Sequence, residues 1–160
     1  MPNAYILTGT NLGDRILFLE TAARKIEQNC GETIVISSVY ETAAWGKTDQ
    51  PNFLNQALQI KTDLNPDALL NKLLSIEAEM GRIRAEKYGP RTIDIDILLY
   101  DGLEINSPEL QIPHPQLPNR KFALMPLAEI APKLIHPVFH NSIEELLNLC
   151  TDPLAVTRFK

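Results

Sequence analysis

The alternation of apolar and polar residues along the first 102 positions predicts strands and helices in a definite order. Apolar residues recur at helical spacing after Asp14 and after Pro66, and Gly31 and Gly81 are suited to end these two helices. The segments between and around them are β-branched or alternate in polarity, as is typical of strands. We expect strands over residues 4–8, 33–40, 53–62 and 93–100, and helices over residues 14–31 and 66–81.

This β-α-β-β-α-β order is that of a ferredoxin-like α+β fold, in which an antiparallel sheet carries its helices on one face. After residue 102 the chain becomes rich in proline, and two shorter helices are expected around residues 121–131 and 142–150. The sequence contains no internal repeat, low-complexity segment or linker. We therefore expect one domain over residues 1–160, with the C-terminal tail packed as an extension on the same core.

The predicted strand at residues 93–100 carries two acids in an otherwise apolar run, IDIDILLY. Because alternate side chains of a strand point to opposite faces, Asp94 and Asp96 project together, away from the isoleucines. Carboxylates about 6.5–7 Å apart along a strand are able to converge on two cations, as in two-metal phosphoryl transfer. Hard oxygen ligands favour Mg²⁺ or Mn²⁺. The alternative is an ordinary solvent-facing strand surface.

The segment before this strand, GRIRAEKYGPR, favours the metal site. It holds Arg82, Arg84, Lys87 and Arg91 against a single acid, Glu86. Arginine offers planar, bidentate donors that suit phosphate oxygens. Glycine near both ends makes the segment a candidate lid that closes over a ligand. A basic loop followed directly by paired acids indicates a phosphate site.

The charge of the whole chain narrows the classes of partner. The net charge is −5 and the isoelectric point about 5.2, which argues against a nucleic-acid or membrane-surface binder. The sequence shows no secretory signal and no apolar run of membrane-spanning length, so we expect a cytoplasmic protein. Cys30 and Cys150 suit a reducing compartment, although a single disulfide between them is compatible with the sequence.

Other short motifs carry less weight. GTNLGD at residues 9–14 favours the start of a helix over a phosphate-facing turn, and GKT at residues 46–48 lacks the other parts of a P-loop. His136 and His140 flank Pro137 and are expected to be surface histidines rather than zinc ligands. His114 lies between two prolines, and beside a phosphate site it would be able to donate to an oxygen.

Three segments together resemble one enzyme family: QPNFLN, GPRTIDIDILLYDG and IPHPQLPNRKFALMPLAEIAP. They are similar to the 6-hydroxymethyl-7,8-dihydropterin pyrophosphokinases of folate biosynthesis, and the resemblance runs from residue 9 to about residue 135. It implies the same α+β fold and transfer of the diphosphoryl group of ATP to the pterin hydroxyl, with release of AMP. It also implies ATP as co-substrate and two Mg²⁺ ions. We expect a monomer with no nucleic-acid or membrane partner.

The resemblance implies roles for particular residues. Asp94 and Asp96 would hold both Mg²⁺ ions, and Arg82 and Arg91 would stabilise charge in the transition state. The ATP site would contain Glu77, Arg84, Arg91, Ile97, His114 and Arg120. The pterin site would contain Thr42, Ala43, Trp45, Phe53, Asn55, Tyr88, Asp94 and Phe122. Phe53 and Phe122 would stack on the pterin ring, and Tyr88 stands where the family often has tryptophan.

Two other functions remain compatible with these residues. Paired acids on such a sheet also serve nucleotidyltransferases and cyclases, which attack the α-phosphorus and release pyrophosphate instead of AMP. A non-catalytic domain of the same fold that senses a small ligand would consume no ATP, and changing Asp96→Ala would not affect it.

Overall fold

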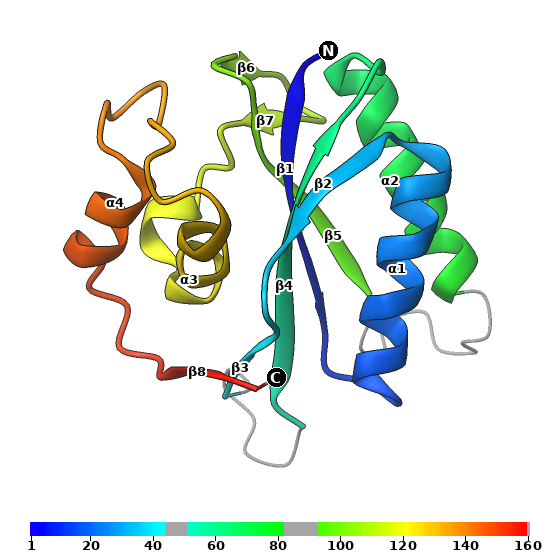
Figure 1. The fold of residues 1–160 in the computed structure, drawn as a ribbon, viewed down its shortest axis with the longest axis horizontal. Helices are drawn as coiled ribbons and strands as arrows, with labels where there is room; N and C mark the ends of the chain where they lie inside the picture. Colours follow the sequence, from blue (N-terminus) through cyan, green and yellow to red (C-terminus); the bar gives the residue numbers. More distant parts are fainter. Residues whose placement is uncertain (44–50, 82–92, 160) are drawn as a thin grey trace.

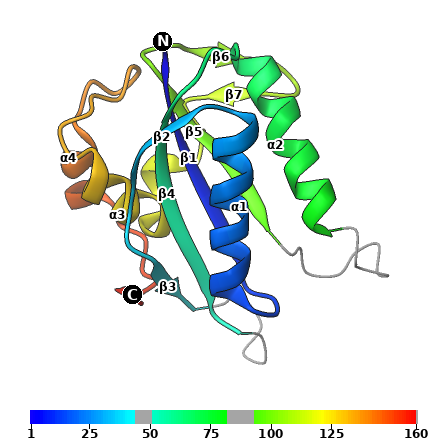
Figure 2. The ribbon, with the colours of Figure 1, turned by 45° about the vertical axis from the view of Figure 1, so that its right-hand side comes forward.

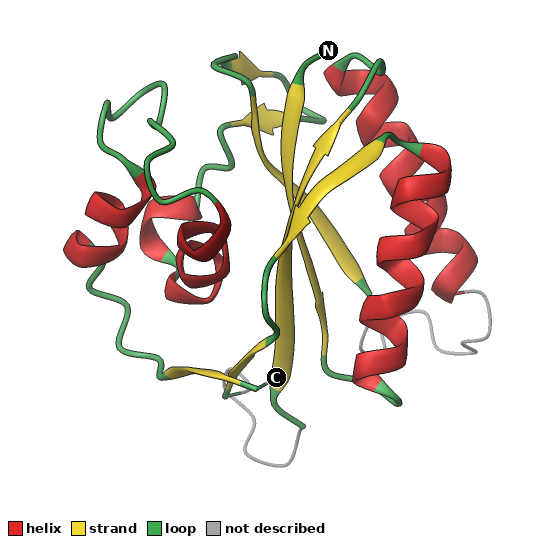
Figure 3. Cartoon of the chain, viewed as in Figure 1, coloured by secondary structure: helices red, strands yellow, loops and turns green. Residues whose placement is uncertain are grey.

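An antiparallel sheet runs through the centre of the molecule, and helices cover both of its faces (Figures 1 and 3). The computed structural model describes residues 1–43, 51–81 and 93–159. The strands of the main sheet are β1 (Asn3–Thr10), β2 (Glu32–Ile36), β3 (Tyr40–Thr42), β4 (Phe53–Lys61), β5 (Asp94–Tyr100) and β8 (Val156–Arg158). The helices are α1 (Arg15–Asn29), α2 (Pro66–Gly81), α3 (Lys121–Ile130) and α4 (Ile143–Leu149). Two short strands, β6 (Ile105–Asn106) and β7 (Gln111–Ile112), pair separately, and a 3₁₀ turn covers Leu117–Asn119.

The strand order β5-β1-β4-β3-β8, with β2 also paired to β4, confirms the predicted α+β fold with an antiparallel sheet. β1 and β4 form its centre and pair along their whole length, from Asn3 opposite Lys61 to Thr10 opposite Leu54. The start of α1 follows the expectation from GTNLGD, because Asp14 Oδ1 accepts a hydrogen bond from Leu17 N at 3.1 Å.

The prediction of one strand over residues 33–40 was wrong, because this segment forms two strands, β2 and β3. The interruption falls at two serines. Ser37 Oγ accepts a hydrogen bond from Ala57 N at 2.9 Å, and Ser38 N–H donates to the Glu129 carboxylate on α3 at 2.9 Å. Serine side chains that bond to nearby backbone compete with regular strand pairing. The strand pairing is therefore interrupted between β2 and β3, which both run antiparallel to β4.

α1 and α2 lie together on one face of the sheet and bury the first hydrophobic core (Figure 2). The expectation that the tail extends this same core holds for Leu110 and Ile112, which are buried in it, but was wrong for the two tail helices. α3 and α4 cover the opposite face and enclose a second core with Tyr5, Leu7, Leu98 and Leu99 of the sheet. The β1–β5 register shifts by one residue at Leu98, so both leucines of β5 face this second core.

Glu129 joins α3 to the edge of the sheet. Its carboxylate accepts hydrogen bonds from the Tyr40 hydroxyl at 2.7 Å and from Ser38 N–H, and Arg158 of β8 donates to Ser38 Oγ. Burial by itself would raise the pKa of Glu129, but the hydrogen bonds outweigh it and hold that pKa below its ordinary value. Burial and the same carboxylate raise the pKa of Tyr40 to about 12. Glu129 is therefore charged and Tyr40 neutral at neutral pH.

The expectation of a surface position was wrong for His136, which is only 2% exposed, and correct for His140, which is exposed. His136 Nδ1 accepts hydrogen bonds from Val138 N and Phe139 N, both at 3.1 Å, and its ring lies 4.7 Å from that of Phe139. The imidazole completes a tight turn, and its buried Nδ1 keeps two hydrogen-bond donors from the backbone. Burial also lowers its pKa.

Cys30 and Cys150 are both free thiols, and burial raises the pKa of Cys30 to about 11. Within residues 1–43, 51–81 and 93–159, none of the helices has both the length and the hydrophobicity needed to cross a bilayer.

Candidate active site

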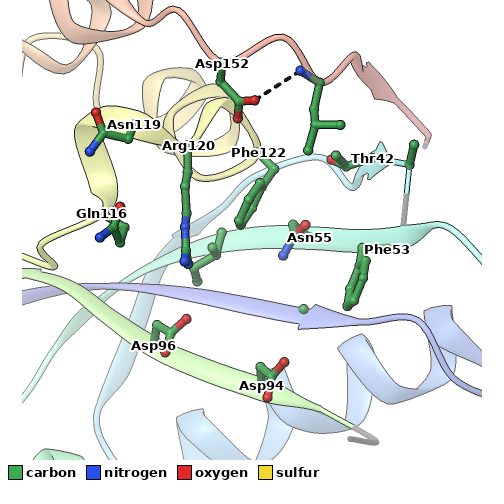
Figure 4. A pocket seen from close by; sticks show the side chains of 14 residues that line it. Thr42, Phe53, Asn55, Asp94, Asp96, Gln116, Asn119, Arg120, Phe122 and Asp152 are labelled. Carbon is green, nitrogen blue, oxygen red and sulfur yellow. Dashed lines mark hydrogen bonds between the residues drawn. The ribbon is translucent and has the colours of Figure 1, made fainter. Parts of the chain in front are cut away.

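A cavity of about 520 Å³ opens on the sheet face that also carries α3 (Figure 4). Its walls come from the strands β1, β3, β4 and β5, from the start of α3 and from the C-terminal segment before β8. The lining residues are Leu7, Gly9, Thr42, Ala43, Phe53, Asn55, Asp94, Asp96, Gln116, Asn119, Arg120, Phe122, Asp152 and Leu154.

The register of three neighbouring strands builds the floor of this cavity. Gly9 of β1 lies opposite Asn55 of β4 on one side and opposite Asp94 of β5 on the other. Two residues back along β1, Leu7 lies opposite Asp96. Because residues directly opposite each other in a sheet share a face, this pairing brings the Asn55 amide and both carboxylates to one surface.

Gly9 leaves room for the Asn55 side chain at the centre of this floor. A Cβ atom at this position would collide with the side-chain amide nitrogen of Asn55. In the absence of a Cβ, Asn55 Nδ2 lies across β1 and donates to the carbonyl oxygen of Thr8 at 3.3 Å. Asn55 is 6% exposed, so this hydrogen bond fixes the orientation of a buried amide at the cavity wall.

Asp94 and Asp96 are partly exposed, whereas Ile93, Ile95 and Ile97 are buried in the first core, as the alternation along the sequence predicts. Both carboxylates line the cavity, and their oxygens are the ligand type that suits Mg²⁺. The part of the chain that the structure describes contains no cluster of three metal-ligating side chains. These two acids therefore fit a cation whose other ligands come from phosphate oxygens or water.

Glu77 supports the strand that carries the two acids. Its Oε2 accepts a hydrogen bond at 2.7 Å from the backbone N–H of Ile95, which lies between Asp94 and Asp96. Glu77 does not line the cavity. α2 therefore acts on the site through the backbone of β5.

His114 lies near the carboxylate end of the cavity. Its Nδ1 accepts a hydrogen bond from Gln116 N at 3.1 Å, which leaves the ring proton on Nε2. Burial lowers the pKa of His114, Asp96 opposes that shift and Arg120 adds to it. The imidazole is therefore a neutral hydrogen-bond donor at neutral pH.

Aromatic rings form the other end. Phe53 begins β4 and Phe122 stands in the first turn of α3, and Asn55 lies between the two rings in the view of Figure 4. The Arg120 guanidinium lies 5.6 Å from the centre of the Phe122 ring. The Thr42 hydroxyl is buried without a hydrogen-bond partner among the described residues, so this wall has an unused polar group.

The structure brings most of the described candidate residues into one cavity. It gathers Thr42, Ala43, Phe53, Asn55, Asp94, Asp96, Arg120 and Phe122. Three candidates do not line it: Glu77, His114 and Ile97, the last of which is 5% exposed in the first core. The candidates Trp45, Arg82, Arg84, Tyr88 and Arg91 lie outside the described residues, as does GKT at residues 46–48.

Sequence reasoning missed six lining residues: Leu7, Gly9, Gln116, Asn119, Asp152 and Leu154. Gly9 had a signal, since a glycine inside a strand pattern indicates close approach by another group. Gln116 and Asn119 stand within a segment that carries the family resemblance. Nothing in the sequence around Asp152 and Leu154 indicates a site.

Comparison with known proteins identifies the family of this chain. Residues 5–132 match the family described as 7,8-dihydro-6-hydroxymethylpterin-pyrophosphokinase (HPPK). The chain is 46% identical over 145 residues to 2-amino-4-hydroxy-6-hydroxymethyldihydropteridine pyrophosphokinase of Aquifex aeolicus, covering 91% of this chain and 90% of that protein. It is 47% identical over 128 residues to the protein of the same name from Bacillus subtilis, covering 79% of this chain and 77% of that one.

Solved structures support the fold. Plasmodium falciparum HPPK-DHPS, crystallised as wild type with pterin and p-hydroxybenzoate, superposes with a TM-score of 0.75 at 21% identity over 92% of this chain. The A437G form of that protein, with STZ-DHP, gives the same TM-score at 20% identity and 92% coverage. This chain spans less than half of either solved chain, 42% and 45% respectively. From the sequence matches, the chain belongs to the 7,8-dihydro-6-hydroxymethylpterin pyrophosphokinase family of enzymes.

Proposed function

We propose that this protein transfers the diphosphoryl group of ATP to the hydroxyl of 6-hydroxymethyl-7,8-dihydropterin, with release of AMP. Family membership supports the reaction type, and the names of the relatives indicate the pterin substrate. The observation that carries the proposal is the pairing across Gly9, which places the Asn55 amide and the Asp94 carboxylate on the floor of one cavity.

The end of the cavity near Phe53 and Phe122 suits a flat bicyclic ring. Aromatic faces stack on such a ring and exclude water from it. Asn55 uses one amide hydrogen on the Thr8 carbonyl, so its Oδ1 and second hydrogen have a defined direction toward a ligand. A pterin presents a matching amide-like edge with both donors and acceptors. The Thr42 hydroxyl, which has no hydrogen-bond partner in the described part of the chain, offers a further polar contact on the same wall.

The end near Asp94 and Asp96 suits the phosphates of ATP bound with divalent cations. The two carboxylates would hold two Mg²⁺ ions, and phosphate oxygens would complete the coordination. Bound Mg²⁺ neutralises charge on the phosphates and makes the β-phosphorus easier to attack. The carboxylates also lie on the same floor as the pterin-binding amide, which directs the pterin hydroxyl toward the phosphate end.

Basic groups around this end would bind the remaining charge. Arg120 lines the cavity, and neutral His114 has its ring proton on Nε2, where it is able to donate to a phosphate oxygen. Ile97 and Glu77 remain predicted parts of the ATP site. The roles of Arg82, Arg84, Arg91, Tyr88 and Trp45 also stay predictions. So do a monomeric state, a single domain and a cytoplasmic location.

The reaction products test this proposal. Purified protein is incubated with ATP, Mg²⁺ and 6-hydroxymethyl-7,8-dihydropterin, and we expect equal amounts of AMP and pterin diphosphate. With γ-labelled ATP, the label should appear on the pterin. A matched pterin with a methyl group in place of the hydroxymethyl group should yield no AMP. Release of pyrophosphate would instead identify a nucleotidyltransferase, and no consumption of ATP would favour a ligand sensor.

A further inference from the structure

The first turn of α3 places two residues in the cavity but lacks a capping side chain of its own. Arg120 occupies the N-cap position and makes no side-chain capping bond, with Phe122 two residues later. Both side chains line the cavity. A helix whose first N–H groups have no acceptor loses stability at that end, so the position of this turn needs another source of support.

Asp152 supplies that support from outside the helix. Its Oδ2 accepts a hydrogen bond at 3.1 Å from the backbone N–H of Lys121, the residue between Arg120 and Phe122. Its Oδ1 accepts another, at 3.0 Å, from Leu154 N, as the dashed line in Figure 4 shows. A carboxylate at a helix N-terminus also interacts favourably with the helix dipole. One side chain therefore ties the start of α3 to the C-terminal segment.

The C-terminal segment is itself fixed on the far side of the cavity. After Leu154, which lines the cavity, β8 pairs antiparallel with β3, and Val156 lies opposite Thr42. The segment thus runs from the start of α3 to the strand edge at Thr42, another lining residue. It lies beyond residues 5–132, which the family profile matches.

We infer that Asp152 is a positioning residue of this site: its carboxylate holds the first turn of α3, and thereby keeps Phe122 and Arg120 directed into the cavity. The consequence for pterin binding rests on the proposed function. The effect on the first turn of α3 does not, because it follows from the hydrogen bonds alone.

The test compares the caps of two helices, of which α3 contributes described lining residues to the cavity and α4 does not. Asp152→Ala removes the external cap of α3. Ser142→Ala removes the N-cap of α4, where Ser142 Oγ accepts from Glu145 N at 3.2 Å, and α4 contributes no described lining residue. Asp152→Asn keeps one acceptor and nearly the same volume. Urea unfolding of all three variants establishes that they fold and measures the stability that each loses.

We expect Asp152→Ala to raise the KM for the pterin about fivefold to tenfold, which is the fold-change that corresponds to the usual free energy of a lost helix cap. The value of kcat should change less than about twofold. Asp152→Asn should show a smaller rise, and Ser142→Ala none. Without any ligand, amide hydrogen exchange over residues 121–124 should become faster in Asp152→Ala than in Ser142→Ala.

Two results would overturn the inference: unchanged exchange over residues 121–124 in Asp152→Ala, or an equal rise in KM in Ser142→Ala. If the wild-type protein releases no AMP, the proposed function fails, and the exchange measurement alone then decides the role of Asp152. If the wild type releases AMP and Asp152→Ala matches it in both KM and exchange, the function stands and the positioning role is refuted.

Discussion

The carboxylate of Glu77, near the end of α2, accepts a hydrogen bond at 2.7 Å from the backbone N–H of Ile95 in β5. Among the described residues β5 is an edge strand of the main sheet, so no described strand pairs with the backbone groups on its outer side. Glu77 satisfies one of them at the residue between Asp94 and Asp96. The helix on one face of the sheet thereby helps to set the direction of two side chains on the other face.

Removing this contact should reduce both turnover and stability. We expect Glu77→Ala to lower the free energy of unfolding by about 1–3 kcal/mol, because a partly buried N–H loses its acceptor. Turnover should fall about tenfold, since the two acids shift with the backbone. AMP release and urea unfolding measure the two effects.

The matched control for this prediction is Glu79→Ala on the same helix. Glu79 pairs with Lys25 at 2.8 Å on a largely exposed surface, and such pairs contribute little. Glu77→Gln retains an acceptor oxygen, so it should keep most of the turnover and stability that Glu77→Ala loses. A rise in the KM for ATP in Glu77→Gln, with unchanged stability, would instead support the direct ATP contact that the family resemblance implies.

Asp94→Ala and Asp96→Ala should each remove most activity and leave the fold intact. Both side chains are partly exposed on the cavity floor, so their loss opens no hole in either core. We expect turnover to fall by about 100-fold or more, because a bound metal ion stabilises the charge of the transition state by several kcal/mol. Asp63→Asn, at an exposed position, is the control. Near wild-type AMP release from either alanine variant would refute the two-metal site.

Phe122→Leu and Phe53→Leu should weaken pterin binding while the protein keeps its stability. Leucine preserves apolar volume but removes the flat face, and the stacking of an aromatic pair contributes about 0.5–1.5 kcal/mol, which corresponds to a rise in Kd of about twofold to twelvefold. Calorimetric titration with the pterin measures this change. Phe18→Leu replaces an aromatic residue that packs against the first core and should leave pterin binding unchanged. An equal effect in all three variants would exclude a specific stacking role.

His136 should make the protein less stable as the solution becomes acidic. Its pKa in the folded protein lies below the ordinary value of 6.5, mainly because the ring is buried. The unfolded chain therefore takes up a proton near that value while the folded chain does not, and the stability present above pH 6.5 decreases as the pH falls.

The measurement is urea unfolding of wild type and His136→Gln between about pH 7.5 and pH 5. The variant should be less stable at the higher pH, since glutamine cannot reproduce the paired hydrogen bonds to Val138 N and Phe139 N, and its stability should depend less on pH. His140→Gln, at the exposed end of the same turn, removes only the smallest contribution to the lowered pKa of His136, so most of the wild-type slope should remain. An unchanged slope in His136→Gln would contradict the assignment.

Local patterns predicted much of the fold because they depend on neighbours in the chain. Alternation in IDIDILLY is enough to place Asp94 and Asp96 opposite the isoleucines, and helical spacing with glycine stops is enough to locate α1 and α2 within a few residues. The break between β2 and β3 escaped prediction because it depends on Ser38 meeting Glu129, a residue 91 positions away. The burial of His136 escaped it because a turn around the ring supplies its donors.

The sequence by itself determined the order of strands and helices, the outward direction of the two acids and the segments that resemble the pyrophosphokinase family. Only the tertiary structure decided that Gly9 separates Asn55 from Asp94, that the tail builds a second core, and that Asp152 caps α3. The physical reason is the range of the interactions involved. Periodicity and capping act over a few residues, whereas strand register and the burial of α3 and α4 bring together groups from distant parts of the chain.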